Sequence, residues 1–142
     1  MTTTILQARE AITALLDNIA DLNAYDAEPP KIKFPAAIVG LPDIDFYTSF
    51  GPGGTYEYDL PIYVFEKLQL LAEASKTLAL LCDVSGDLSI FETLAGADPT
   101  LGALVDDITV RSVKQIGADT YADIPVLACE FTVHVIARRA TA

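Results

Sequence analysis

The sequence predicts an α+β fold in which a mainly antiparallel sheet carries its helices on one face. Two segments, 5–19 and 66–82, repeat apolar residues with the period of an amphipathic helix. Five segments have the character of strands, namely 36–39, 44–50, 53–65, 104–116 and 126–137. With a short second helix at 88–95, the predicted order is α-β-β-β-α-(α)-β-β, and residues 1–142 are expected to form one domain.

The first helix begins after the run Thr2 to Thr4, which can cap it. Its apolar face is formed by Ile5, Ala8, Ile12, Leu15, Leu16 and Ile19. The prolines of "EPPK" predict that segment 21–35 is a connection without regular structure. The strand at 36–39 then ends at Gly40 and Pro42, and a second strand follows at 44–50.

The glycines of "GPGG" turn the chain at 51–54 into the strand "GGTYEYDLPIYVF". They lead into a strand and no Lys follows, so a hairpin turn is favoured over a phosphate-binding loop. Alternation puts Tyr56, Tyr58, Leu60, Ile62 and Val64 on one face of this strand. Pro61 cannot donate to a sheet ladder, so the sequence predicts an edge strand or a bulge.

The helix at 66–82 carries a broad apolar stripe, and the short helix at 88–95 stops before Asp98 and Pro99. In the strand at 104–116, Ser112 and Lys114 interrupt the apolar row. The last strand alternates most clearly, with Leu127, Cys129, Phe131, Val133 and Val135 on one side and Ala128, Glu130, Thr132 and His134 on the other. One face of the sheet is therefore expected to be apolar and to take the helices, and the other to be polar.

The charge and the hydropathy exclude several classes of protein. The net charge of −11, from 20 acidic and 9 basic residues, argues against wrapping nucleic acid, which requires Lys and Arg. With 51% hydrophobic residues the chain is not disordered. It has no apolar run long enough to span a bilayer and no recognisable secretory signal, so we expect folding in a cytoplasm and no membrane partner.

Residue types that carry catalysis or bind metals are sparse. Cys82 and Cys129 lack CxxC spacing and are expected to be buried, reduced thiols. His134 is the single histidine, and Glu130 on the same strand lies about 13 Å away, too far for a direct pair. We therefore expect no catalytic, metal or cofactor site, and we interpret His134 as a residue of the polar face.

Acidic pairs and aromatic residues indicate a contact surface. The pairs Asp43 with Asp45, Glu57 with Asp59 and Asp106 with Asp107 are expected at solvated strand edges. Arg138 and Arg139 can pair with such carboxylates on a neighbouring subunit or remain solvated. Seven aromatic residues fall within 46–65, and some must lie on the face without helices. The predicted interface residues are Tyr47, Phe50, Glu57, Asp59, Pro61, Tyr63, Asp106, Asp107, Arg138 and Arg139.

The order of these segments resembles the small tail-terminator and head–tail joining proteins of long-tailed phages, particularly those of actinobacterial hosts. An amphipathic N-terminal helix is followed by "FPAAIVGLPDIDF" and "GGTYEYDLPIYVF", then by a central helix, "ADPTLGALVDDITV" and "ACEFTVHVIA". The resemblance covers nearly the whole chain. It brings no catalytic residues with it.

The resemblance implies a structural virion protein that is assembled in the host cytoplasm. Such proteins form rings, typically hexamers, that cap the head-proximal end of the tail tube, stop its polymerisation and meet the head connector. The genome passes through the ring, and the acidic surplus suits a lumen that repels DNA. We expect the proline-containing strand 53–65 to be the assembly edge. The alternatives are a neck or head-completion protein, and a small ligand-binding module that uses the polar sheet face.

Overall fold

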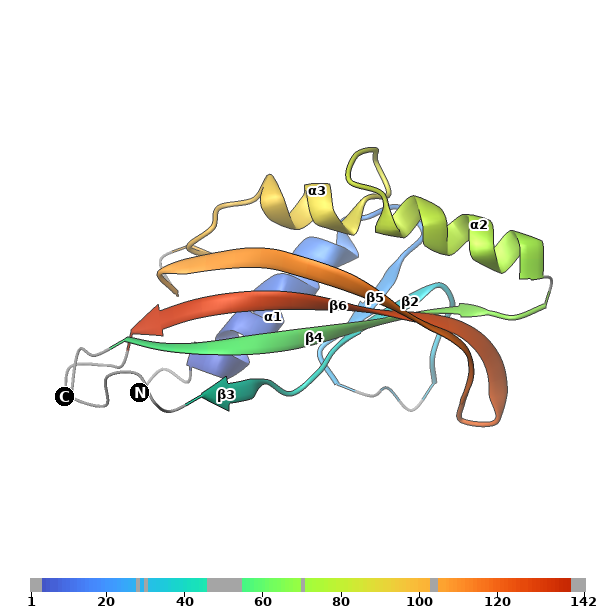
Figure 1. Cartoon of the computed structure of the whole chain (residues 1–142), viewed down its shortest axis with the longest axis horizontal. Helices are drawn as coiled ribbons and strands as arrows, with labels where there is room; N and C mark the ends of the chain where they lie inside the picture. The colour runs from blue at the N-terminus through green and yellow to red at the C-terminus, as the bar shows by residue number, and fades with distance from the viewer. Residues whose placement is uncertain are drawn as a thin grey trace.

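The computed structural model describes residues 4–27, 29, 31–45, 55–69, 71–102 and 105–138. In that part of the chain the helices are α1 (Thr4–Asp17), α2 (Leu71–Cys82) and α3 (Ile90–Ala95). The strands are β1 (Asn23–Tyr25), β2 (Ala36–Val39), β3 (Asp43–Asp45), β4 (Thr55–Lys67), β5 (Asp107–Tyr121) and β6 (Ile124–Arg138). The helices lie on one side of a six-stranded sheet (Figure 1), which confirms the predicted α+β class.

The strands are ordered β1-β2-β4-β6-β5, and β3 pairs with β4 on the same side as β2. All pairs are antiparallel except β1 with β2, which is parallel. Strand β1 lies within segment 21–35, where an irregular connection was predicted, so that prediction was wrong at this point. Its first residue, Asn23, donates from its backbone N–H and from its side chain to the carbonyl oxygen of Pro35.

Strand β4 occupies the middle of the sheet, and the prediction that it is an edge strand was wrong. It pairs with β6 along its whole length and with β2 and β3 on its other side. Pairing with β2 ends at Ile62 and pairing with β3 begins at Asp59, so Pro61 lies opposite the break between the two short strands. The Pro61 carbonyl accepts from the Gly40 N–H at 2.8 Å on this side. Because the nitrogen and the carbonyl of one residue face the same neighbour, the missing N–H of Pro61 faces Gly40 just beyond the end of β2, and no bond between β4 and β6 is lost.

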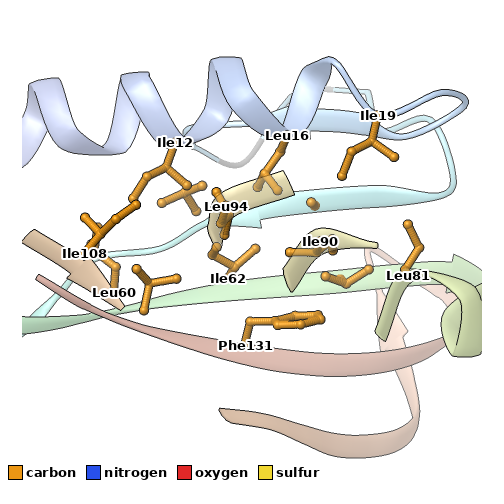
Figure 2. Packing of buried hydrophobic residues seen from close by; sticks show 14 of the residues in the cluster. Ile12, Leu16, Ile19, Leu60, Ile62, Leu81, Ile90, Leu94, Ile108 and Phe131 are labelled. Carbon is orange, nitrogen blue, oxygen red and sulfur yellow. The ribbon is translucent and has the colours of Figure 1, made fainter. Parts of the chain in front are cut away.

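The core lies between the sheet and the helices, as the alternation predicts. Ile12 and Leu16 of α1, Leu60 and Ile62 of β4, and Phe131 of β6 are at most 1% exposed. Figure 2 shows these side chains directed toward one another across the interface between the helices and the sheet. Burying each of them removes apolar surface that would otherwise contact water, worth about 1.5 to 3 kcal/mol per side chain.

The long hairpin of β5 and β6 differs from the prediction in its length. Strands were predicted at 104–116 and 126–137, but the strands continue to Tyr121 and from Ile124, and the turn consists of Ala122 and Asp123. Both turn residues have positive φ, 46° and 67°, which suits a two-residue hairpin turn between twisted strands. The register of β5 shifts between Val110 and Ser112 and again between Gln115 and Gly117. Each shift adds one residue to β5, so the side chains after it point to the opposite face from the one that simple alternation predicts, and this interrupts the apolar row.

The helix boundaries follow local hydrogen bonds. Helix α2 begins at Leu71 rather than at 66, because β4 continues to Lys67. Helix α3 starts after Ser89, which is fully buried, accepts from the Glu92 N–H at 3.0 Å and donates to the carbonyl oxygen of Asp83. None of the described helices has both the length and the apolar character that crossing a bilayer requires.

Candidate functional site

The candidate site is the face of the sheet opposite the helices, called here the outer face. Alternation along β4 directs Glu57, Asp59, Pro61, Tyr63 and Phe65 to this face, because Tyr58, Leu60, Ile62 and Val64 between them are buried against the helices. Of the predicted interface residues, Glu57, Asp59, Pro61 and Tyr63 therefore share one surface.

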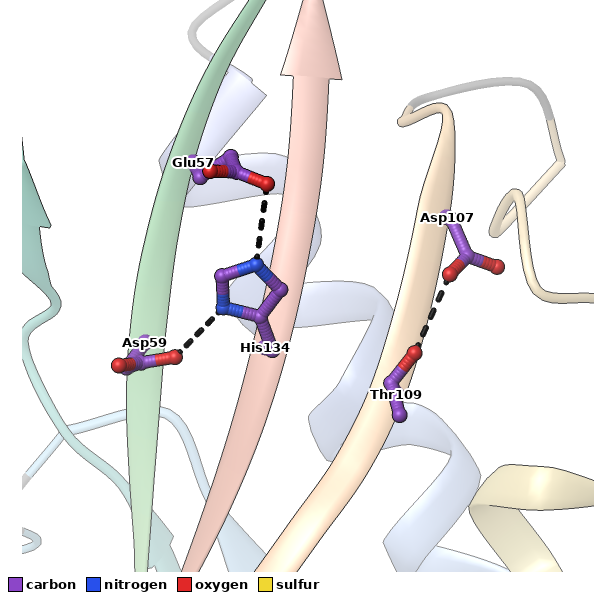
Figure 3. Close-up of polar contacts among 5 residues, drawn as sticks. All are labelled: Glu57, Asp59, Asp107, Thr109 and His134. Carbon is purple, nitrogen blue, oxygen red and sulfur yellow. Dashed lines mark hydrogen bonds and ion pairs between the residues drawn. The ribbon is translucent and has the colours of Figure 1, made fainter. Parts of the chain in front are cut away.

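His134 lies between two carboxylates of the neighbouring strand. The register of β4 and β6 puts Asp59 opposite His134, and His134 Nδ1 lies 2.7 Å from Asp59 Oδ1. His134 Nε2 lies 3.3 Å from Glu57 Oε1. Figure 3 shows the imidazole bridging the two carboxylates along β4. Each ring nitrogen of His134 thus has a carboxylate oxygen as its neighbour, and both contacts hold the ring between β4 and β6.

Further carboxylates gather around this pair, and we call Asp43, Glu57, Asp59 and Asp107 the acidic cluster. The register places Asp43 of β3 beside Asp59, and Asp107 of β5 opposite Ile136, which is itself opposite Glu57. Thr109 Oγ1 donates to Asp107 Oδ2 at 3.1 Å (Figure 3). The cluster thus draws on β3, β4 and β5, and His134 of β6 lies among its carboxylates at one end of the outer face.

The cluster is poorly arranged for general acid–base catalysis. A catalytic imidazole needs one nitrogen directed at a nucleophile or a substrate, whereas both nitrogens of His134 face carboxylates. Within the described ranges, no group of three His, Cys, Asp or Glu residues is placed to hold a metal ion. Glu57 and Asp59 keep 43% and 42% of their side chains exposed, so they remain available to a partner.

The other end of the outer face is apolar and concave. A groove of about 640 Å³ is lined by Arg9, Ala27, Ile38, Val39, Gly40, Leu41, Tyr63, Phe65, Ile116, Asp119 and Tyr121. The rings of Phe65 and Tyr121 lie 5.3 Å apart between centroids although β6 separates their strands. On this side of β4, Phe65 lies opposite Ala128 of β6, which in turn lies opposite Gly117 of β5, and these small residues let the curled hairpin bring Tyr121 over Phe65. Burial, with Glu130 and Asp43 nearby, raises the pKa of Tyr63.

The remaining predicted residues divide into three groups. Asp107 belongs to the acidic cluster, and Asp106 precedes it, with its N–H bonded to the Ile136 carbonyl at 2.8 Å. Arg138 pairs with Thr55 at the end of β6, and its side chain is outside the described part. Tyr47, Phe50 and Arg139 lie outside the described residues.

Sequence reasoning missed two features of this surface. The contact between His134 and Asp59 depends on the register of strands 75 residues apart, which no local pattern reveals. The role of Tyr121 was missed because the strand was predicted to end at 116. Its position in an alternating "ADTY" segment before Ala122 and Asp123 is the signal that a longer hairpin would have left.

Comparison with known proteins gives little. No model of a protein family matches the chain, and no curated protein sequence does. Among solved structures, the chain is similar to a chain of the virion of a native gene transfer agent particle, with a TM-score of 0.41 and 16% identity over 94% of this chain and 91% of that chain. At this identity and TM-score, the similarity assigns no function to the chain.

Proposed function

We propose that this chain is a structural virion protein of a long-tailed phage and not an enzyme. Within that class we propose a tail terminator, which forms a ring on the head-proximal end of the tail tube, stops its polymerisation and joins the tail to the head connector. The order of sequence segments supports the class. The structural observation that carries the ring is the contrast between the basic middle of the edge strand β5 and the exposed carboxylate of Asp43 on the β3 side of the sheet.

One side of the sheet ends in β5, which pairs with β6 alone among the described strands. It is 15 residues long, and Arg111 and Lys114, two of the nine basic residues of the chain, are exposed in its middle. A long edge strand offers a row of unpaired backbone N–H and C=O groups to another chain. The two register shifts and the charges restrict which chain can pair there.

The opposite side of the sheet ends in β1 and β3, where Asp43 is exposed and lies beside Asp59 of the neighbouring strand β4. A ring requires a contact between two different surfaces of each subunit. Placing the β5 side of one subunit against the β3 side of the next brings basic residues to acidic ones, which favours that orientation over its reverse. This arrangement replaces the edge expected at β4.

The acidic surplus supports the same proposal. A net charge of −11 lets a DNA duplex pass a ring without binding to it, because phosphates are repelled by carboxylates. The partners proposed are further copies of this chain, the tail tube protein and the connector proteins of the head.

The proposal is tested by deleting the coding sequence from the phage that produces the chain and imaging the particles by electron microscopy. Overlong tails, unjoined and beside filled heads, are expected of a terminator. Tails of normal length that fail to join heads would assign the chain to the neck instead. Intact virions would overturn the structural role.

The contact between subunits is tested by complementing that deletion with charge variants. Lys114→Glu with Arg111→Glu is expected to abolish complementation, and adding Asp43→Lys is expected to restore part of it. Lys76→Glu on the exposed side of α2 is the matched control and should complement fully. Equal complementation by all three would exclude the β5 side as a subunit contact.

The apolar groove favours a second candidate, a small ligand-binding module. Its aromatic lining and the Arg9 guanidinium, which donates to the Val39 carbonyl at 3.0 Å, are features of small-molecule sites. Tyr63→Ala and Tyr121→Ala open this groove without touching the charged sides of the sheet. If the deletion leaves virions intact, this candidate would be supported by a small molecule that binds the unaltered chain and that neither the Tyr63→Ala nor the Tyr121→Ala variant binds.

A further inference from the structure

Two thiols that are far apart in the sequence are in contact in the core. Cys82, the last residue of α2, and Cys129, in the middle of β6, are free cysteines with their Sγ atoms 3.5 Å apart. The sequence predicts two buried, reduced thiols, and the structure buries Cys129, leaves Cys82 half-buried and brings the two together across the interface between helix and sheet.

The two thiols differ in exposure and in acidity. Cys129 is only 3% exposed, whereas Cys82 is half-buried. The hydrogen bond with Cys129 lowers the pKa of Cys82, and the same bond together with burial raises the pKa of Cys129. The C-terminal end of α2 disfavours a thiolate, so Cys129 is the group that stabilises the Cys82 thiolate.

A route from solvent reaches the pair. A concave space of about 290 Å³ is lined by both cysteines and by Ser75, Leu78, Ala79, Val113, Gln115 and Leu127. It opens between α2 and the β5–β6 hairpin and is large enough for part of a small organic molecule. Its lining contains no charged side chain.

We propose that Cys82 and Cys129 form a redox-active dithiol that reduces small organic disulfides and closes to an internal disulfide. The Cys82 thiolate attacks one sulfur of the organic disulfide, so the Cys82–S bond forms and the organic S–S bond breaks, releasing one organic thiolate. Cys129 then attacks Cys82 Sγ, its proton goes to the second departing thiolate, and the internal S–S bond forms. The proton that Cys82 loses on forming its thiolate passes through water to the first organic thiolate. The protein thus loses two protons and two electrons, and one organic disulfide becomes two thiols.

The final bond requires the two sulfurs to approach by about 1.5 Å, because a disulfide is about 2.05 Å long. Cys129 is fixed by pairing to β4 and β5 on both sides. Cys82 is at the end of a helix that continues into the exposed segment 83–87, so the movement falls on Cys82. The chemistry of the pair is independent of the proposed role in a virion.

The charge of the chain selects among oxidants of this class. The net charge is −11, and the exposed Asp83 follows Cys82 directly. A cationic disulfide such as cystamine is therefore expected to react faster than the dianionic dithiodiglycolate. Added salt should reduce this difference.

The test is to treat the reduced full chain with cystamine, block the remaining thiols with an alkylating reagent and measure the intact mass. The expected product has lost two hydrogens, carries no cysteamine and takes no alkyl group until dithiothreitol restores both thiols. A stable cysteamine adduct in the unaltered chain, or a disulfide-linked dimer as the main product, would overturn the proposal.

Single variants separate the two roles. Cys129→Ala is expected to stop at a cysteamine adduct on Cys82, and Cys82→Ala to react little, because Cys129 is buried with a raised pKa. Alkylation of Cys82 should slow in Cys129→Ala, about threefold for each unit by which its pKa rises, because the lower thiolate fraction is partly offset by a more nucleophilic thiolate. Cys129→Ser, which keeps a donor, should slow it less. Circular dichroism of each variant establishes that it is folded. Equal reactivity of the folded Cys82→Ala and Cys129→Ala variants would exclude the assigned roles.

Discussion

Gly40 donates its backbone N–H to the carbonyl oxygen of Pro61 at 2.8 Å, at the point where β2 has ended and β3 has not begun. This contact places a proline in the middle of the sheet with its missing N–H at the break between β2 and β3, where it removes no bond between β4 and β6. It also requires a close approach, because a Cβ atom on Gly40 would lie 2.9 Å from Pro61 Cγ and 3.0 Å from Tyr63 Cε2.

Gly40→Ala is therefore expected to lower the free energy of unfolding by about 1 to 3 kcal/mol, since the pyrrolidine ring cannot move aside without disturbing β4. Urea denaturation of the variant measures this. Pro61→Ala alone should change stability little, because the added N–H faces the break between β2 and β3. In the Pro61→Ala background the cost of Gly40→Ala should fall by about 1 kcal/mol. Strictly additive effects would show that the ring of Pro61 is not what Gly40 accommodates.

Tyr58 is only 2% exposed, and its buried hydroxyl has no hydrogen-bond partner among the described residues. Removing an unsatisfied buried polar group is favourable, so Tyr58→Phe is expected to raise the free energy of unfolding by about 1 kcal/mol. Tyr56 stacks on Tyr58 with centroids 5.8 Å apart and offers the matched control, Tyr56→Phe. A loss of stability in Tyr58→Phe would mean that the hydroxyl does have a partner.

The same residue predicts a response to alkaline pH. Burial, and secondarily Tyr56, raises the pKa of Tyr58 above its usual value near 10. The folded-state pKa lies above the unfolded one. The contribution of the neutral Tyr58 hydroxyl to the free energy of unfolding is therefore complete below about pH 10 and is lost as the pH rises further. Stability measured by urea denaturation should therefore fall less steeply above about pH 10 in Tyr58→Phe than in the unaltered chain.

Asp98 predicts a response to acid. Its carboxylate accepts from Thr100 Oγ1 at 2.7 Å and Thr100 N–H at 2.9 Å, and from the Gly102 N–H at 3.2 Å. These bonds, that of the Thr100 side chain first, lower the pKa of Asp98. A folded-state pKa below the unfolded one gives stability that is present above about pH 4 and is lost as the pH falls further. Asp98→Asn should lose less stability between about pH 5 and pH 2 than the exposed control Asp87→Asn.

Much of the fold could be predicted because its long elements bury many residues in a regular pattern. The alternation of Leu60, Ile62 and Val64 is compatible only with a strand that buries one face. The spacing of Ile12 and Leu16 likewise indicates a helix that buries one face. Strand β1 is three residues long, too short to show a pattern. The central position of β4 was missed because the rule that assigns proline to an edge assumes a continuous neighbour, and here the neighbour is interrupted at Gly40.

The sequence identified several residues of the site, but it did not show which of them lie together. Glu57, Asp59 and Asp107 were selected as charged strand residues, and His134 as a residue of the polar face. Their meeting depends on which residues face each other across β4, β6 and β5, and register is a property of the assembled sheet. The Cys82–Cys129 contact was missed for the same reason, since 47 residues separate the two thiols.

His134 supports the sheet by separating negative charges. When it donates from both nitrogens it carries a positive charge between Asp59 and Glu57, so His134→Ala leaves the acidic cluster with carboxylates that repel one another. Both carboxylates are more than 40% exposed, and solvent screening limits the expected loss to about 1 kcal/mol. The loss should shrink in about 0.5 M salt, because the Debye length then falls to a few ångströms. Adding Asp59→Asn should recover part of the loss, whereas Thr132→Ala, two residues earlier on the same face, should show no salt dependence. Urea denaturation at low and high salt measures all three variants, and a loss in His134→Ala that salt does not change would assign it to packing instead of charge.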